Sequence, residues 1–265
     1  QGEVFIFFGN FTTASQANVT AVLANLSYNG TETNANLNVQ GKIGDWNNDT
    51  IDDFALGARG ATTAGVTRGG QIYILLGSNT IRTPAAGTNV QSIANITING
   101  TVTNEDLGHY NYNLLGDDIN RDGIPDLIFS DPVGDQGGNK TRIFFGARNF
   151  SAFHMSYNAG QANVSLNGSL LGGDMITVGF GVSTWDFDND NVTEVVVGDN
   201  DYDGGGTNRG IVAVFEVFDN LAPRLIVNFP TNLSNHTATN LSLNITVSDE
   251  LSGLSSCYFT NVSGQ

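Results

Sequence analysis

Short apolar runs separated by polar turns dominate this chain and predict β-strands. Three of the runs are rich in aliphatic residues and end in Gly or another small residue: Phe54–Ala58, Leu127–Ser130 and Val195–Gly198. Apolar runs of this length, bounded by turn-forming residues, are typical of buried strands rather than helices. We therefore expect an all-β protein.

A second set of strands follows the first at a regular distance. These runs carry glycine or aromatic residues at their ends: Gly69–Gly77, Thr141–Gly146 and Arg209–Phe215. A further copy, Gly2–Gly9, opens the chain. Units of several strands that recur at such a period are typical of a β-propeller or a related radial array.

An acidic loop of one pattern precedes each of the first three runs. The loops begin at residues 45, 118 and 186, which places them 73 and 68 residues apart. Positions 1, 3, 5 and 9 carry side-chain oxygens and position 7 is aliphatic, the alternation by which a short loop wraps a hard cation. The predicted metal ligands, with the position-7 residue contributing its carbonyl, are Asp45, Asn47, Asp49, Ile51 and Asp53; Asp118, Asn120, Asp122, Ile124 and Asp126; and Asp186, Asp188, Asp190, Val192 and Glu194.

The ligand chemistry favours Ca²⁺ at about three sites. No His or Cys lies in any loop, which argues against zinc and copper, and the number of oxygens suits Ca²⁺ better than octahedral Mg²⁺. Asp- and Asn-rich turns without a metal are the alternative, which three loops in matching frames disfavour. An EF-hand is excluded because its position-12 Glu is replaced by Leu56, Phe129 and Val197 and strands are expected on either side.

The loops and their flanks resemble the FG-GAP repeats of the integrin α-subunit β-propeller. The matching flanks are Gly179-Phe180-Gly181 before the third loop, and Gly57-Ala58-Arg59, Ser130-Asp131-Pro132 and Gly198-Asp199-Asn200 after the three loops. The resemblance covers residues 1 to 218 and implies propeller blades with calcium-binding hairpins. Three units and an opening strand are too few to close a ring, since even small propellers need about four blades.

Position 6 of the loop departs from the family pattern. Gly123 keeps the usual glycine, whereas Thr50 and Asn191 stand at this position in the first and third loops. Asn adopts a left-handed backbone readily, but a β-branched residue does not. We therefore expect the first loop to bind its ion more weakly.

The composition changes after residue 219 and predicts a second domain. Leu225–Val227 lies between two prolines, Leu241–Val247 alternates apolar and polar residues, and Ser256–Phe259 follows a turn. These runs predict the start of an immunoglobulin-like β-sandwich over 220–265, after FG-GAP-like repeats over 1–219; a complete sandwich needs about 100 residues. We expect either a piece of a longer surface protein or subunits that complete one another by strand exchange.

Charge and glycosylation signals favour a protein exported to the cell surface. The net charge of −16 disfavours nucleic acid or an anionic membrane as a direct partner, and no apolar stretch reaches transmembrane length. Seventeen Asn-x-Ser/Thr motifs occur, of which Asn48 and Asn191 lie inside metal loops and are not expected to carry glycans. The predicted N-glycosylation sites are Asn10, Asn18, Asn25, Asn29, Asn95, Asn99, Asn139, Asn149, Asn163, Asn167, Asn232, Asn235, Asn240, Asn244 and Asn261.

Enzymatic activity is not expected. His109, His154 and His236 are scattered, and no nucleophile elbow, P-loop or dinucleotide fingerprint is present. The repeated loops account for the carboxylates without catalysis. The single Cys257 fits either a small buried side chain or half of a disulfide whose partner lies elsewhere.

Two functional hypotheses remain from the sequence. The first is a calcium-stabilised, N-glycosylated extracellular structural protein, a subunit of a cell-surface filament, stalk or layer that assembles with copies of itself through head-to-tail, β-strand-mediated contacts. The second is an adhesin or lectin-like propeller that binds a protein or glycan ligand. Its candidate binding loops lie around Tyr110, Tyr112 and Asp199–Gly206.

Overall fold

The computed structural model confirms an all-β protein. It describes residues 1–7, 21, 24–78, 87–109, 114–131, 140–147, 155–167, 181–199, 210–217, 224–229 and 244–248. The regular structure of these residues is β-strand except for short 3₁₀ turns such as Val90–Ser92 and Ala159–Gln161. The chain divides into two compact units, Gln1–Val217 and Phe218–Gln265.

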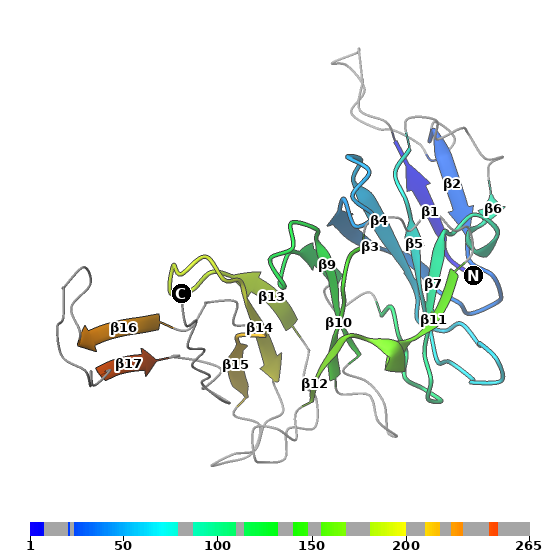
Figure 1. The fold of residues 1–265 in the computed structure, drawn as a ribbon. Helices are drawn as coiled ribbons and strands as arrows, with labels where there is room; N and C mark the ends of the chain where they lie inside the picture. Colours follow the sequence, from blue (N-terminus) through cyan, green and yellow to red (C-terminus); the bar gives the residue numbers. More distant parts are fainter. Residues whose placement is uncertain are drawn as a thin grey trace, which may run out of the picture. The chain divides into compact units, whose positions relative to one another are not determined.

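The strands of the first unit form four sheets, numbered here in chain order (Figure 1). Sheet 1 has the order β1 (Glu3–Ile6), β2 (Leu26–Asn29) and β6 (Thr88–Asn89). Sheet 2 has the order β11 (Met155–Asn158), β7 (Ile96–Asn99), β5 (Gln71–Leu75), β4 (Asp53–Ala58) and β3 (Leu37–Gly44). Sheet 3 has the order β12 (Val164–Asn167), β10 (Lys140–Phe144), β9 (Asp126–Asp131) and β8 (Leu114–Asp117), and sheet 4 has the order β13 (Gly181–Trp185), β14 (Glu194–Asp199) and β15 (Ile211–Phe215).

Sheets 2, 3 and 4 are built to one plan. Each contains an antiparallel hairpin that encloses an acidic loop, namely β3–β4, β8–β9 and β13–β14. The second strand of the hairpin then pairs with β5, β10 or β15, in matching register. The strands expected beside the loops and the outer strands that follow them are therefore confirmed.

A further strand of this plan was not predicted. It pairs with the outer strand in sheets 1, 2 and 3, as β2, β7 and β12. Its sequence signal is the repeated pattern Asn-x-Ser/Thr-x-Asn-Gly, which begins at Asn25, Asn95 and Asn163. Because β1 matches β5 and β2 matches β7, sheet 1 contains the outer pair of strands of one more sheet of this plan.

Successive sheets pack face to face. In sheets 1, 2 and 3 we call the face toward the next of sheets 1 to 4 the forward face, and the opposite face the backward face. In sheet 4 the backward face is the one toward sheet 3, and the forward face is the opposite one. The forward face of sheet 1, with Val4 and Tyr28, packs on the backward face of sheet 2, with Leu56, Tyr73 and Leu75. This contact contains the smaller part of the apolar core that the described residues form.

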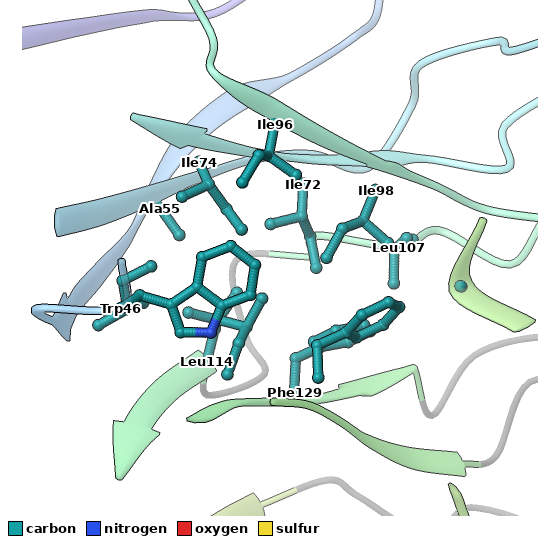
Figure 2. Close-up of a cluster of buried hydrophobic side chains, with 13 residues drawn as sticks. Trp46, Ala55, Ile72, Ile74, Ile96, Ile98, Leu107, Leu114 and Phe129 are labelled. Carbon is teal, nitrogen blue, oxygen red and sulfur yellow. The ribbon is translucent and has the colours of Figure 1, made fainter. Parts of the chain in front are cut away.

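A second core lies between the forward face of sheet 2 and the backward face of sheet 3. Figure 2 shows the Trp46 ring among aliphatic side chains of sheet 2 with Leu114 and Phe129 of sheet 3 near it. Trp46 belongs to the first acidic loop, so the side chain at loop position 2 is part of this core. Sheets 3 and 4 meet at β8, β9 and β13, where the Thr184 hydroxyl lies 2.6 Å from Asp117 Oδ2.

A buried ion pair connects sheet 3 to the loop that follows β7. Arg142 donates to Glu105 Oε1 over 2.9 Å, and both side chains are almost fully buried. Arg142 also donates to the Ala159 carbonyl, and Glu105 accepts from the backbone amide of Val102. The remaining polar atoms of the pair therefore have partners, which a buried ion pair requires.

The second unit contains a hairpin-like pair of strands, β16 (Arg224–Phe229) and β17 (Asn244–Ser248), in antiparallel register. The third strand expected there, Ser256–Phe259, and Cys257 within it lie outside the described residues. Among the described residues of the whole chain, no closed ring of sheets is present. No helix among the described residues of the chain has the length and apolar character to cross a membrane.

Candidate metal centres

The three acidic loops occupy the same place in their sheets, the turn between the first two strands. The aliphatic side chain at position 7 turns inward in each loop. Ile124 and Val192 are buried and Ile51 is half-buried. This apolar anchor fixes the middle of the loop, while positions 1, 3 and 5 stay at its exposed end.

One hydrogen-bond network recurs in all three loops. In the first loop, the Asp49 amide donates to Asp45 Oδ1 and Asn47 Oδ1, the Thr50 amide donates to Asp45 Oδ2, and the Ile51 amide donates to Asp49 Oδ1. The second and third loops repeat each of these bonds at the equivalent positions. The donor–acceptor distances over the three loops lie between 2.6 and 3.2 Å. The network therefore orients the oxygens at positions 1, 3 and 5 in the same way each time.

The carboxylate at position 9 connects the loop to the rest of its sheet. Asp53 accepts from the Trp46 amide at 2.9 Å with one oxygen and from the Gly77 amide at 2.7 Å with the other. Asp126 accepts in the same way from the amides of Ile119 and Gly146, both at 3.0 Å. This carboxylate closes the loop against the end of the outer strand.

Gly77 and Gly146 are required by this closure. A Cβ at Gly77 would lie 2.3 Å from the Asp52 carbonyl oxygen, and one at Gly146 would lie 2.3 Å from the Pro125 carbonyl oxygen. Only glycine lets the backbone approach the loop this closely. In sheet 4 Val217 stands at this position, and Glu194 accepts from the Phe187 amide within the loop.

Burial leaves two of these carboxylates with perturbed acidity. Desolvation raises the pKa of Asp53 and that of Asp126 to about 6, against the lowering effect of their backbone hydrogen bonds. Within the described residues, the ion pairs are Lys42–Asp52, Arg68–Asp106 and Arg142–Glu105, so neither carboxylate has a cationic side-chain partner. A buried negative charge of this kind is stabilised by a bound cation.

The backbone of each loop turns through the left-handed region twice. At position 4, φ is 56° for Asn48, 57° for Arg121 and 63° for Asn189. At position 6, φ is 76° for Thr50, 84° for Gly123 and 69° for Asn191. The requirement at position 6 was expected from the sequence, whereas the one at position 4 was not.

Thr50→Gly is expected to stabilise the first loop. A β-branched residue at positive φ costs about 1–2 kcal/mol, and glycine removes this cost while keeping the Thr50 amide bond to Asp45. Gly123→Thr is the reciprocal change in the second loop and is expected to destabilise it by a similar amount. Chemical denaturation of both variants measures the two effects, and a loss of stability in Thr50→Gly would contradict the strain.

The third loop brings the most negative charge together. Ligand atoms of Asp186, Asp188 and Glu194 all lie within 4.8 Å of one another. In the first two loops position 3 is Asn, whose amide donates to the position-5 carboxylate at 3.0 and 3.2 Å. Asp188 has no such donor, so the carboxylates of the third loop repel one another unless a cation neutralises them. The all-oxygen donor set of the three loops fits a hard divalent cation.

Several predicted glycosylation sites lie just before or at the end of the strands marked by the Asn-x-Ser/Thr-x-Asn-Gly pattern, where asparagine has a structural role. Asn95 Oδ1 accepts from the Leu76 amide, and Asn163 Oδ1 accepts from the Phe145 amide. Asn99 is buried, and its side-chain nitrogen, the atom that a glycan would modify, already donates to Ser156 and to the Tyr157 carbonyl. Part of the excess of motifs therefore reflects the strand pattern itself.

The other glycosylation candidates stand differently in the structure. Asn29 is half-buried and donates to the Gly87 carbonyl, and Asn25 is exposed just before β2. Asn167 and Asn244 lie on described strands. The remaining predicted sites lie outside the described residues: Asn10, Asn18, Asn139, Asn149, Asn232, Asn235, Asn240 and Asn261.

Candidate residues for ligand binding or catalysis are placed only in part. Tyr110, Tyr112 and 200–206 lie outside the described residues, and Asp199 is buried. His154 and His236 also lie outside them. His109 is buried beside Arg59, whose guanidinium lies 2.6 Å from its ring nitrogen, and burial together with this charge lowers the pKa of His109.

Comparison of the chain with protein-family models and with curated proteins found no match.

Proposed function

We propose that this protein is a calcium-stabilised, N-glycosylated extracellular structural protein, a subunit of a cell-surface filament, stalk or layer. The observation that carries the proposal is the same hydrogen-bonded acidic loop in three successive sheets. In sheets 2 and 3 the position-9 carboxylate also joins the loop to the outer strand. Such loops contribute rigidity to each sheet, which is what a load-bearing subunit needs.

Ca²⁺ is the ion we assign to the loops. The residues that would hold it are the side chains at positions 1, 3, 5 and 9 with the position-7 carbonyl, which together with water provide the six to eight oxygens that Ca²⁺ takes. A bound ion neutralises carboxylates that otherwise repel one another, above all Asp186, Asp188 and Glu194. Millimolar calcium outside cells suits sites of this kind.

The architecture we propose for the first unit is a series of FG-GAP-type β-propeller blades. The shared plan of sheets 2, 3 and 4 supports it, since each combines a hairpin, an acidic loop and an outer strand in the same register. For the second unit we propose an incomplete immunoglobulin-like sandwich, supported by the β16–β17 pair. Glycans on the exposed asparagines, such as Asn163, complete the proposed surface coat.

Electron microscopy of the full chain in calcium tests the structural role. We expect elongated particles or filaments. We also expect that material from the natural source binds a glycan-specific stain and has a mass greater than that of the polypeptide alone. Monodisperse single particles over a wide range of protein concentration would contradict a filament subunit. Binding of such particles to a protein or glycan array would then favour the adhesin or lectin-like alternative.

A further inference from the structure

Exposed apolar side chains gather at the two ends of the series of sheets. The large hydrophobic side chains that are exposed in the described residues are Phe5, Phe7, Val39, Trp185, Phe187, Val212 and Val214. Four of them belong to sheet 4 or to its acidic loop and two to the first strand region. Only Val39 lies elsewhere, on β3 of sheet 2.

Alternation along β15 places Val212 and Val214 on the forward face of sheet 4. The backward face carries Val182, Val195 and Val197, which are buried. Val212 pairs with Gly198 and Val214 with Val196, residues that alternate with the buried valines of β14. Neighbouring strand residues point to opposite faces, so Val212 and Val214 share the face that does not pack on sheet 3.

The same positions are buried in the two preceding sheets. By the common register, Val212 and Val214 match Ile72 and Ile74 in sheet 2 and Thr141 and Ile143 in sheet 3. Ile72 and Ile74 are 1% and 0% exposed, and Thr141 and Ile143 are both 0% exposed. Val212 and Val214 are 67% and 52% exposed. A forward face that the next sheet covers twice is therefore open in sheet 4.

The residues around the third loop show the same difference. Position 2 of the loop is Trp46 in sheet 2 and Ile119 in sheet 3, and both side chains are buried. In sheet 4 it is Phe187, which is exposed. The residue before the loop is Gly44 in sheet 2 and Asp117 in sheet 3, and each lies against the next sheet. A Cβ at Gly44 would touch Pro125, and Asp117 lies 2.6 Å from the Thr184 hydroxyl.

Trp185 holds this position before the third loop. Its side chain is 69% exposed, and its ring centroid lies 5.5 Å from that of Phe187. The two rings and the two valines form an exposed apolar patch on the forward face of sheet 4, which also carries the exposed Ser183 opposite Val196.

The other end of the series exposes a complementary backward face. Phe5 and Phe7 match Tyr73 and Leu75 in sheet 2, which are buried against sheet 1. Both phenylalanines are partly exposed, and a hollow of about 350 Å³ beside Phe5 is lined by Glu3, Ala21, Ala24, Asn25, Leu26 and Ser27. This hollow has room for bulky side chains such as those on the forward face of sheet 4.

We propose that the forward face of sheet 4, formed by Trp185, Phe187, Val212 and Val214, docks on the backward face of sheet 1 of a second copy of this chain. The contact repeats, between copies, the forward-to-backward packing that joins sheets 1, 2 and 3 within the chain. It is heterologous and does not close on itself, so it propagates into a fibre. This contact rests on the proposed function. It is a stacking of sheet faces between copies, in addition to the strand exchange expected from the sequence.

Three full-chain variants test the contact by sedimentation velocity in calcium. Val214→Lys blocks the forward face, Phe5→Lys blocks the backward face, and Val39→Lys is the matched control because Val39 is as exposed as Val212 but lies outside both faces. All three change exposed side chains and are expected to fold, which circular dichroism checks. We expect wild type and Val39→Lys to form oligomers, and each end-blocked variant to associate at least about tenfold more weakly.

Mixing the two end-blocked variants gives the decisive result. Val214→Lys keeps a free backward face and Phe5→Lys keeps a free forward face, so the mixture is expected to form a one-to-one dimer that neither variant forms alone. Self-association of Phe5→Lys would show that the forward face pairs with itself and would overturn the proposal. Assembly of Val214→Lys as strong as wild type would overturn this contact and leave the filament function standing, whereas wild type that never assembles would refute both.

Discussion

Removal of calcium is expected to lower the midpoint of thermal unfolding of the full chain by on the order of 20 °C. A ligand bound only by the native state contributes about 2.7 kcal/mol per site when its concentration is 100 times the dissociation constant, hence about 8 kcal/mol for three such sites. In a unit of this size 1 kcal/mol corresponds to about 2–4 °C. Differential scanning calorimetry in calcium and in excess chelator measures the change.

The physical reason lies in the carboxylates. Asp53 and Asp126 are buried without a cationic side-chain partner among the described residues, and three carboxylates of the third loop converge within 4.8 Å. Without a cation, folding must bring these charges together at a cost. Magnesium at the same concentration is the control and is expected to restore less of the midpoint, because its octahedral shell fits these loops less well. An identical midpoint with and without chelator would refute calcium binding.

Asp126→Ala is expected to destabilise the protein by about 2–6 kcal/mol even in the presence of chelator. Asp126 accepts from the amides of Ile119, Asn120 and Gly146, and alanine leaves these donors without an acceptor. The bonds from Ile119 and Gly146 are buried, and each buried donor that loses its partner costs about 1–3 kcal/mol, hence about 2–6 kcal/mol for the two. Urea unfolding monitored by circular dichroism gives the change in the free energy of unfolding.

Asp122→Asn is the matched control for this effect. The Asp122 side chain accepts from the Ile124 amide and, at an exposed position, from the Asn120 side-chain amide. Asparagine can retain the bond to Ile124 and loses only the exposed one, while it removes the charge that a cation needs. In chelator we expect Asp122→Asn to match wild type within about 0.5 kcal/mol, and in calcium we expect it to lose the contribution of one site. If Asp126→Ala were as stable as Asp122→Asn in chelator, position 9 would be a metal ligand without a structural role.

The strands and the loops could be predicted because their signals are local. A short apolar run such as Val195–Gly198 leaves little choice but a buried strand, and the oxygens at alternate loop positions define the turn before it. The left-handed backbone at position 6 also follows from local chemistry, since Gly123 and Asn191 favour it. Thr50 opposes this preference and adopts φ of 76° because the rest of the loop fixes the turn.

Partners that are distant in sequence were beyond such reasoning. The bond from the Gly77 amide to Asp53 and the ion pair between Arg142 and Glu105 join residues that no local pattern links. The structural role of Asn99 was likewise hidden, because its sequence reads equally well as a glycosylation motif. Only the packing of β7 between its neighbours shows that its side-chain amide is already engaged.

The sequence by itself determined that the protein is all-β, where most of its strands lie and which residues form three equivalent acidic loops. Period-2 alternation, turn chemistry and the spacing of oxygen ligands are properties of short segments, so they can be read directly. The tertiary structure decided which sheet faces are covered. Ile72 and Val212 occupy equivalent positions in their strands, yet one is buried and the other exposed, because burial depends on whether another sheet follows on that face.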